Sequence, residues 1–258
     1  MNIISIVNQK GGVGKTTTTI NLAAALAKRS KRVLVIDLDP QRNATTTLNC
    51  NKQYTGPGIN DLIYFSVSCY PYELGAFIKR NEVERVDFIP STSMLASAPN
   101  ILAQDRDSYM VLRRLIRTPE LEEQYDYVLI DCKPSLDLLV GNALVASDSV
   151  IVPVQPDDYS LDGLADLWST VEGIQDRYNE NLKIGGILIT LADRRRKVTK
   201  RIINELRELF GDLVYQTVLP NSADCGNAKE LGRSVVNYSG NQLGQLYEEF
   251  AGEVLMDE

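Results

Sequence analysis

The chain has 258 residues, of which 44% are hydrophobic and 24% charged, and its 27 Lys and Arg against 34 Asp and Glu give a formal net charge of −7. This length and composition suit one globular α/β domain, so we expect residues 1–258 to form a single domain and exclude a disordered or fibrous chain. The acidic charge argues against nucleic acid or anionic lipid binding over the whole surface, so either ligand would need a local basic patch.

Several residue types that usually carry chemistry are absent or scattered. The sequence has no histidine, which removes the commonest general base and metal ligand. Four cysteines lie far apart without a CxxC pair, so we expect reduced, partly buried thiols and neither a zinc site nor a disulfide framework. The N-terminus does not resemble a signal peptide and no stretch is apolar enough to span a bilayer, so we expect a cytoplasmic protein.

Short apolar runs rich in β-branched residues alternate along the chain with longer stretches of helical periodicity. The runs predict strands that are buried on both faces, and the longer stretches predict helices, for example over 16–28 and 199–210. This alternation indicates an α/β fold with a mostly parallel twisted sheet and helices on both faces. The stretch 49–81 has the least pattern, and we expect an irregular insertion there. The predicted strands are 3–7, 33–36, 127–130, 150–154 and 187–190, with weaker candidates at 88–90 and 213–215.

A glycine-rich segment, GGVGKTT, lies between the first predicted strand and the first predicted helix. Strand, glycine-rich loop and helix N-terminus together are the context of the phosphate-binding loop (P-loop) of a P-loop NTPase. The glycines let backbone N–H groups turn towards a polyphosphate, and the helix N-terminus adds partial positive charge. Lys15 would neutralise the β- and γ-phosphates, and the Thr16 hydroxyl would bind Mg²⁺. An ordinary glycine-rich turn is the alternative. The predicted nucleotide-binding residues here are Gly11, Gly12, Val13, Gly14, Lys15, Thr16 and Thr17.

Aspartates follow two of the predicted strands at the point where each strand ends. Asp37 and Asp39 close the strand at 33–36, and Asp131 closes the strand at 127–130. Ligands bind at the carboxyl ends of strands in such folds, so we expect these side chains beside the P-loop. Asp131 looks like a Walker B aspartate, which holds Mg²⁺ directly or through water. A strand-end aspartate can also cap the next helix, and for Asp37 that structural role and a catalytic one are both open.

A second lysine, Lys10, precedes the P-loop lysine by five residues in the sequence KGGVGKTT. This pattern resembles the signature of the deviant Walker A ATPases, the group that includes ParA/Soj, MinD and the nitrogenase iron protein. The resemblance implies a homodimer that sandwiches ATP, in which Lys10 binds the partner subunit's nucleotide and stabilises charge there. It also implies that Asp39, which matches the second Asp of the family's DxDPQ motif, orients the attacking water. A solvated loop residue is the alternative for Lys10. The implied catalytic residues are Lys10, Lys15 and Asp39, and the Mg²⁺ ligands are Thr16, Asp39 and Asp131.

The likeness to ParA/Soj extends over most of the chain. Further motifs follow in the family's order and spacing: DPQ at 39–41, NAT at 43–45, YDY at 125–127, IDC at 130–132, PSL at 134–136, NAL at 142–144 and VPVQ at 152–155. They resemble most the short, Soj-like branch, which begins at its first strand.

Three places depart from the family pattern. Arg42 stands where glycine is usual, and Lys133 replaces the first proline of the family's DCPPS motif. Both substitutions put charge near the expected nucleotide and dimer surface, so the switching kinetics are expected to differ from those of relatives. The segment 219–224 aligns only loosely with the family's purine loop and lacks its arginine, and through it the resemblance implies base contacts by Pro220 and Asn221.

A basic stretch at 193–201 gives the acidic chain its clearest candidate for a DNA-binding surface. An apolar stripe from Val198 to Leu209 recurs at helical spacing and would face the core, which would leave the basic side chains outward. No aromatic residues are interleaved, so we expect non-specific, salt-sensitive binding of double-stranded DNA through its phosphates. A solvated basic helix start is the alternative. The predicted DNA-binding residues are Arg194, Arg195, Arg196, Lys197, Lys200 and Arg201.

The resemblance therefore favours a DNA partition ATPase that is nucleoid-associated and is stimulated by a ParB-like DNA-binding partner protein. A MinD-like membrane switch is the main alternative, but its family ends in a basic amphipathic helix, and residues 243–258 here contain acidic residues and no Lys or Arg. A nitrogenase-iron-protein role needs cysteines that bridge a cluster, and Cys132 has no suitable second cysteine. A nucleotide-switched binding module that hydrolyses little is a third alternative, against which Asp39 argues.

Overall fold

The computed structural model describes residues 1–157, 160–193, 195–238 and 242–256. Its centre is an eight-stranded sheet in the order β3-β4-β2-β5-β1-β6-β7-β8. The pairs are parallel except that β3 runs antiparallel to β4. This confirms the predicted fold class, and every predicted strand is present. The strands are β1 (Asn2–Ile6), β2 (Val33–Leu38), β3 (Lys79–Asn81), β4 (Val86–Ile89), β5 (Tyr127–Cys132), β6 (Ser149–Val154), β7 (Lys183–Ala192) and β8 (Val214–Pro220).

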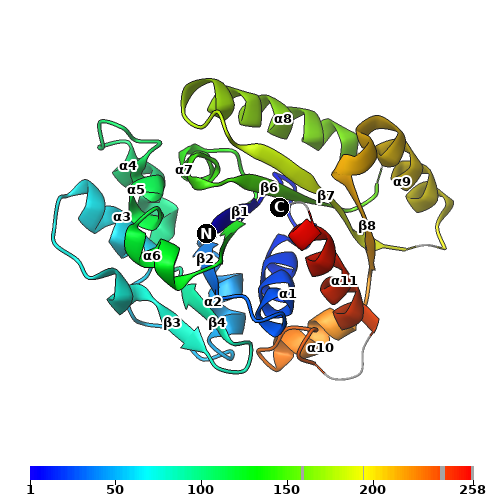
Figure 1. The fold of residues 1–258 in the computed structure, drawn as a ribbon, viewed down its shortest axis with the longest axis horizontal. Helices are drawn as coiled ribbons and strands as arrows, with labels where there is room; N and C mark the ends of the chain where they lie inside the picture. The colour runs from blue at the N-terminus through cyan, green and yellow to red at the C-terminus, as the bar shows by residue number, and fades with distance from the viewer. Residues whose placement is uncertain (158–159, 194, 239–241, 257–258) are drawn as a thin grey trace.

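Helices cover both faces of the sheet, and Figure 1 shows α8 and α11 on opposite sides of it. Buried side chains form two separate hydrophobic clusters, one with α3, α4, α5, α7, α8 and α9 and the other with α1, α2, α10 and α11. The helices are α1 (Lys15–Lys28), α2 (Asn43–Leu48), α3 (Ile59–Val67), α4 (Ala98–Leu102), α5 (Val111–Ile116), α6 (Pro119–Gln124), α7 (Leu138–Ala146), α8 (Ser160–Arg177), α9 (Lys197–Phe210), α10 (Asp224–Glu230) and α11 (Gln242–Met256), with 3₁₀ turns η1 (Leu74–Phe77), η2 (Ser93–Ser97) and η3 (Gly211–Leu213).

The central strands β2 and β5 are buried at every residue, as their continuous β-branched sequences predict for a sheet covered on both faces. Their carboxyl ends meet at one edge of the sheet, where Asp37 pairs in register with Asp131 and Ile6 at the end of β1 also pairs with Asp131. The parallel register therefore gathers the loop after β1 and both strand-end aspartates in one place.

The stretch 49–81 is more regular than the sequence analysis expected. It contains α3, the turn η1 and the edge strand β3. Ile59, Leu62 and Ile63 are buried in α3 at the spacing of one helical face. The prediction of an irregular insertion was wrong because this short apolar stripe lies between glycine and proline residues that break the wider pattern.

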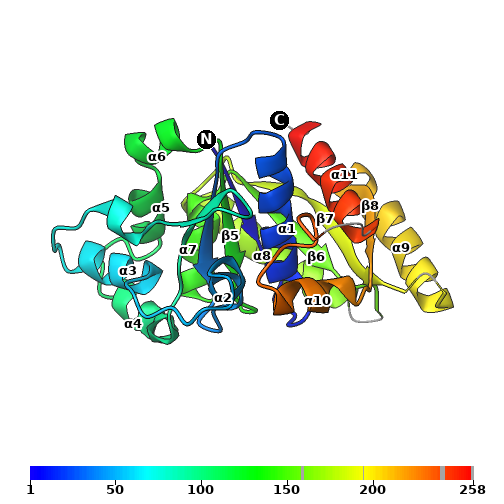
Figure 2. The ribbon, with the colours of Figure 1, turned by 90° about the horizontal axis from the view of Figure 1, so that it is seen from below.

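The helix α11 packs beside α1 and on β8, as Figure 2 shows from a second side. Its Glu253 carboxylate accepts hydrogen bonds from the backbone N–H groups of Gln216 (2.6 Å) and Thr217 (2.9 Å) on β8, which is an edge strand. Among the described residues, none of the helices combines the length and apolar character needed to cross a bilayer.

Candidate nucleotide-binding site

The glycine-rich loop joins β1 to α1 in a conformation that depends on its glycines. Gly12 and Gly14 have φ values of +76° and +87°, a backbone region that residues with a Cβ rarely adopt. Between these two glycines, the Val13 carbonyl accepts a 2.8 Å hydrogen bond from the Thr190 hydroxyl of β7. The loop is thus held against the sheet, and the helix that begins at Lys15 points its N-terminus at the same place.

Lys15 is nearly enclosed, with 7% of its surface exposed. Its Nζ donates a 2.9 Å hydrogen bond to the backbone carbonyl of Lys10. Burial lowers the pKa of this ammonium, while the nearby Asp131 and Asp39 carboxylates act to raise it. A polyphosphate in the loop would add negative charge beside Lys15 and so favour its charged form.

Asp131 lies beneath the first turn of α1 and is fully buried. Its Oδ1 accepts a 3.4 Å hydrogen bond from Thr19, and the Thr16 hydroxyl also bonds the carboxylate. Burial raises the pKa of Asp131 well above its usual range, and the carboxylates of Asp37 and Asp39 raise it further. Within the described chain, its Oδ2 is buried without a hydrogen-bond partner. A buried acceptor that lacks a donor is what a bound cation would satisfy.

The donor set at this place fits Mg²⁺. The described residues contain no group of three or more His, Cys, Asp or Glu side chains that could hold a metal ion by themselves. Mg²⁺ is usually held by one or two protein oxygens together with water and substrate phosphates, so Thr16 and Asp131 suffice beside a polyphosphate. Two of the three predicted Mg²⁺ ligands, Thr16 and Asp131, thus meet here, and the third, Asp39, lines the adjoining cavity; their binding of Mg²⁺ stays a prediction.

Asp37 and Asp39 differ in their surroundings although only one residue separates them. The Asp37 carboxylate accepts bonds from the backbone N–H (2.7 Å) and the hydroxyl (2.6 Å) of Thr45 in α2, and burial raises its pKa to about 6. Asp37 thus anchors α2, which favours the structural alternative. Asp39 bonds the backbone N–H of Gln41 through Oδ1 (2.8 Å) and faces a cavity.

That cavity, of about 460 Å³, lies over the P-loop. It brings together the predicted residues Gly11, Gly12, Gly14, Lys15, Thr16, Thr17 and Asp39. Val13 and Asp131 lie behind its wall, and Lys10 lies outside the lining, with its Nζ in an ion pair with Asp157. The size of the cavity suits a nucleotide-sized ligand.

Neither predicted base-contacting residue lines the cavity. Pro220 ends β8, and the backbone N–H of Asn221 bonds the carbonyl of Ala192 at 3.4 Å, which holds the chain against β7. Their contact with a base stays a prediction without geometric support. The rest of the lining consists of residues that were not predicted as site residues, namely Ile20, Asn21, Gln41, Asn43, Thr47, Pro134, Cys225, Gly226, Ala228, Lys229, Arg233 and Val235.

The part of the lining that comes from residues 225–235 is tied to α1 and α2. The Asn21 side chain of α1 accepts a 2.7 Å bond from the Val235 backbone N–H, and the Lys229 Nζ donates a 3.3 Å bond to the Asn43 side chain. The segment after α10 therefore follows α1 and α2 in space although it is distant in sequence. A short polar helix such as α10 has no periodicity that could have indicated this position.

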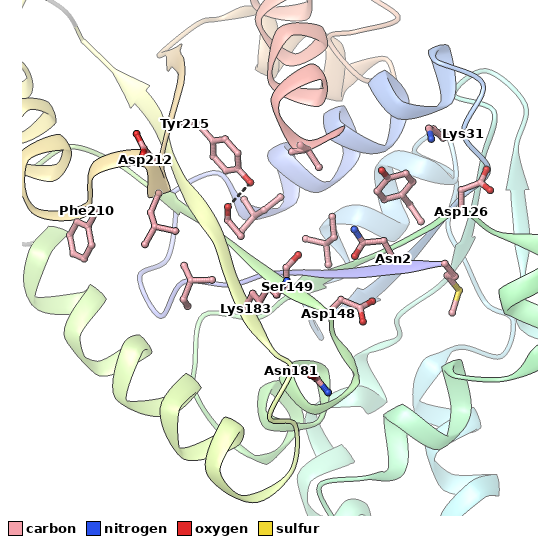
Figure 3. A pocket seen from close by; sticks show the side chains of 18 residues that line it. Asn2, Lys31, Asp126, Asp148, Ser149, Asn181, Lys183, Phe210, Asp212 and Tyr215 are labelled. Atoms are coloured by element: carbon pink, nitrogen blue, oxygen red, sulfur yellow. Dashed lines mark hydrogen bonds between the residues drawn. The ribbon is translucent and has the colours of Figure 1, made fainter. Parts of the chain in front are cut away.

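A larger cavity, of about 960 Å³, lies at the amino ends of the strands (Figure 3). Asn2, Ser149 and Lys183 line it from the starts of three neighbouring strands, and the Tyr215 hydroxyl donates a bond to the Gly185 carbonyl at its side. Val254 from the last turn of α11 also lines it. The C-terminal end of a helix carries partial negative charge, so this cavity is less suited to a polyphosphate than the smaller one.

The basic segment before and along α9 is on the surface. Lys197, Lys200 and Arg201 are exposed, and Arg195 forms a bidentate pair with Asp193 (2.9 and 3.1 Å). Arg196 is also exposed, whereas Arg194 lies outside the described residues. The expectation that the apolar stripe is buried as far as Leu209 was wrong.

Leu209 is 66% exposed. The packed face of α9 is centred on Thr199, Ile202 and Leu206 and extends towards Phe210, which leaves Leu209 at its margin. The basic side chains at the other end of α9 are exposed as predicted, although Leu209 is exposed as well.

The comparisons with known proteins agree with this geometry. Residues 1–184 match the family described as an AAA domain. The sporulation initiation inhibitor protein Soj of Bacillus subtilis (strain 168) is 40% identical over 253 residues, which cover 98% of this chain and 97% of Soj. The chain belongs to the Soj/ParA family of partition ATPases. In the same family, the chromosome partitioning protein ParA of Caulobacter vibrioides (strain NA1000 / CB15N) is 36% identical over 259 residues, with 100% of this chain and 95% of that protein covered.

The family's fold also occurs in a protein with another name. The crystal structure of cobyrinic acid a,c-diamide synthase from Mycobacterium smegmatis with bound ADP and magnesium matches with a TM-score of 0.82 and 28% identity, over 99% of this chain and 94% of that one. The fold alone therefore does not select the reaction, and the site residues must carry that argument.

Proposed function

We propose that this protein is an ATP-dependent DNA partition ATPase, which dimerises on ATP, binds DNA without sequence preference and is released when ATP is hydrolysed. The observation that carries the proposal is the cavity over the P-loop, where an enclosed Lys15, a half-buried Thr16 bonded to the buried Asp131, and Asp39 lie together. The Soj and ParA relatives support the cellular role, since both match over nearly the whole chain.

Each residue of the site has a part in ATP hydrolysis. The backbone N–H groups of residues 11–16 and the Lys15 ammonium would hold the phosphates. Thr16 and Asp131 would hold Mg²⁺, which neutralises charge on the β- and γ-phosphates when bound. Asp39 would orient the attacking water, a role for which it faces the cavity and keeps one carboxylate oxygen away from the Gln41 bond.

Dimerisation gives Lys10 its function in this proposal. Its side chain is 38% exposed at the rim of the site, and its ion pair with Asp157 is only partly shielded from water. Such a pair is weak enough to be exchanged for a stronger phosphate contact. Lys10 would then leave Asp157 and bind the nucleotide of a second copy.

DNA binding is proposed for the exposed basic side chains of α9 and the residues just before it. Two copies would present two such surfaces, and doubling the phosphate contacts strengthens binding without a new kind of contact. This explains how ATP could control DNA affinity in an acidic protein. A ParB-like partner that accelerates hydrolysis, and the resulting nucleoid association, complete the proposal.

The experiment that tests the proposal combines sedimentation with DNA retention, each with and without a non-hydrolysable ATP analogue and Mg²⁺. The wild-type protein should become dimeric and retain DNA only with the analogue. Lys15→Ala should abolish both effects, whereas Lys52→Ala, an exposed lysine away from the cavity, should not. A protein that stays monomeric with saturating analogue and Mg²⁺ would refute the proposal.

Two further variants separate the DNA surface from the catalytic site. Replacing Arg195 and Lys197 with Ala should weaken DNA retention and reduce its salt dependence, and replacing Lys52 and Lys183 should not. Asp39→Ala should keep ATP and DNA binding but lower turnover by about 10²–10⁴-fold, the usual contribution of a general base. Near-normal turnover would remove Asp39 from its role.

A further inference from the structure

Three consecutive residues before the P-loop glycines are bonded to one other part of the chain. The Asn8 side chain donates a 2.8 Å bond to the Pro153 carbonyl at the end of β6, and Lys10 pairs with Asp157. Between them, the Gln9 side-chain amide donates to the Asp166 carboxylate (3.0 Å) and to the Gly163 carbonyl (3.3 Å). The entry to the P-loop is therefore fastened to the segment that runs from β6 into α8.

The Gln9 contact differs from the other two because it reaches the body of a helix. Gly163 and Asp166 are both in α8, and a Cβ at Gly163 would lie 3.7 Å from the Gln9 amide nitrogen, an ordinary contact distance, so Gln9 lies directly against the helix. Below this contact, α8 lies on the sheet through Leu164 and Leu167, which are almost fully buried. A helix that packs through such an apolar stripe can slide by an ångström or two without losing burial.

The same part of α8 also contacts α9. The Trp168 ring, two residues beyond Asp166, packs on the ring of Phe210 with 5.2 Å between the centroids. Phe210 is the last residue of α9, whose other end carries the exposed basic side chains. An unbroken chain of contacts thus runs from Gln9 through α8 to the proposed DNA-binding helix.

We infer that Gln9 and Asp166 are positioning residues that transmit occupation of the P-loop along α8 to α9. Phosphates in the loop draw the backbone N–H groups of residues 11–16 around them, and Gln9 is only two residues from the first of these. Its bonds to Asp166 and Gly163 then shift α8 relative to the sheet, and the Trp168–Phe210 contact moves α9. The inference rests on the proposed function, because it concerns how nucleotide and DNA affinities are coupled.

The chain offers a direct spectroscopic readout, because Trp168 is its one tryptophan. In wild-type protein without DNA, addition of the ATP analogue and Mg²⁺ should change the Trp168 emission spectrum. Gln9→Ala and Asp166→Ala should abolish most of this change. Asp166→Asn keeps an oxygen that can accept from Gln9 and should restore it, and Glu172→Ala, on an exposed part of the same helix, should behave as wild type.

Affinities measured on the same variants distinguish coupling from binding. The affinity for a fluorescent ATP analogue should stay within about twofold of wild type in Gln9→Ala and Asp166→Ala. The affinity for a short duplex DNA in the presence of nucleotide should fall about fivefold, as expected for the loss of one such hydrogen bond from the coupling between two sites. Without nucleotide, DNA binding should be unchanged.

The outcomes of these experiments distinguish failure of the inference about Gln9 and Asp166 from failure of the proposed function. If wild-type protein binds the nucleotide and then DNA, but the Trp168 emission stays constant or Asp166→Ala behaves as wild type, the inference fails and the proposed function stands. If nucleotide affinity falls as much as DNA affinity, Gln9 only supports the P-loop and the inference also fails. If wild-type protein shows no ATP-dependent DNA binding, the proposed function itself fails.

Discussion

Replacing Arg42 with glycine should stabilise the protein. Arg42 lies just before α2 with φ +61° and ψ +30°, in the left-handed region that residues with a Cβ avoid. Its backbone is held there by two bonds, from its own N–H to the Asp39 carbonyl and from the Thr46 N–H to its carbonyl, both 2.9 Å. Within the described part of the chain, its guanidinium makes no hydrogen bond or ion pair that the change would remove.

The size of the effect follows from two opposing terms. The left-handed conformation costs a residue with a Cβ about 1–2 kcal/mol, which glycine avoids. Glycine also gives the unfolded chain more freedom, which costs about 0.5–1 kcal/mol. The net gain for Arg42→Gly is about 0.5–1 kcal/mol, which corresponds to a rise in Tm of about 1–4 °C for a domain of this size.

The assay is thermal unfolding of wild type, Arg42→Gly and Arg42→Ala under identical conditions. Arg42→Ala is the matched control, because it removes the same charge and side chain but keeps the Cβ. Only the glycine variant should gain stability. Equal Tm values for the two variants would show that backbone strain at position 42 is not the cause. Gln41 and Asn43 on either side line the nucleotide cavity, so the ATPase rate of the glycine variant should also be measured.

Three other predictions concern thiol reactivity, pH and a second backbone position. In a variant whose two exposed cysteines are changed to serine, a thiol reagent should modify Cys225 slowly, and Mg²⁺ with ATP should protect Cys225 because it lines the cavity. Cys132 is fully buried and should react only on unfolding. If Cys225 reacted equally fast with and without the nucleotide, its placement in the cavity would be contradicted. Hydrogen bonds from Arg32 hold the pKa of Asp126 at about 2, so their contribution should be complete above about pH 4 and lost as the pH falls towards 2. Asp126→Asn should therefore lower the free energy of unfolding at pH 7 by less than about 1 kcal/mol, since the Arg32 and Asp126 side chains are 55% and 33% exposed and water screens the pair. A difference between the two proteins that persists undiminished at pH 2 in denaturant titrations would refute this. Gly232→Ala should lower the free energy of unfolding of the protein by more than about 1 kcal/mol, because φ at this position is +63° and the new Cβ would lie 2.7 Å from a backbone carbon of the turn after α2. An unchanged Tm would show that this turn can move to make room.

The sheet and the phosphate side of the site could be predicted because each depends on local sequence. A strand buried on both faces needs a continuous apolar run rich in β-branched residues, and Val33–Leu38 supplies such a run and is buried at every residue. The P-loop needs glycines at fixed positions before a helix, and Gly12 and Gly14 have the backbone angles that explain the requirement. The position of Asp131 follows from the parallel register.

The rest of the site depends on contacts between distant segments. The wall from Cys225 to Val235 lies on the P-loop helix through the Asn21 side chain, and nothing in the local sequence of either segment specifies that bond. The base contacts expected at Pro220 and Asn221 stay a prediction for the same reason, since an alignment gives the order of residues but not how far a loop turns after a strand. The bonds of Gln9 with α8 span more than 150 positions and were equally invisible.

The Glu253 carboxylate on β8 has a consequence for how copies of this protein can meet. The free margin of a sheet is a ready surface for another molecule to extend it, and such growth does not depend on any ligand. Here the two amides that would begin that growth are already occupied from within the chain. A further strand could join β8 only after both bonds to Glu253 were broken, so this edge of the sheet is protected against open-ended stacking of one copy on the next.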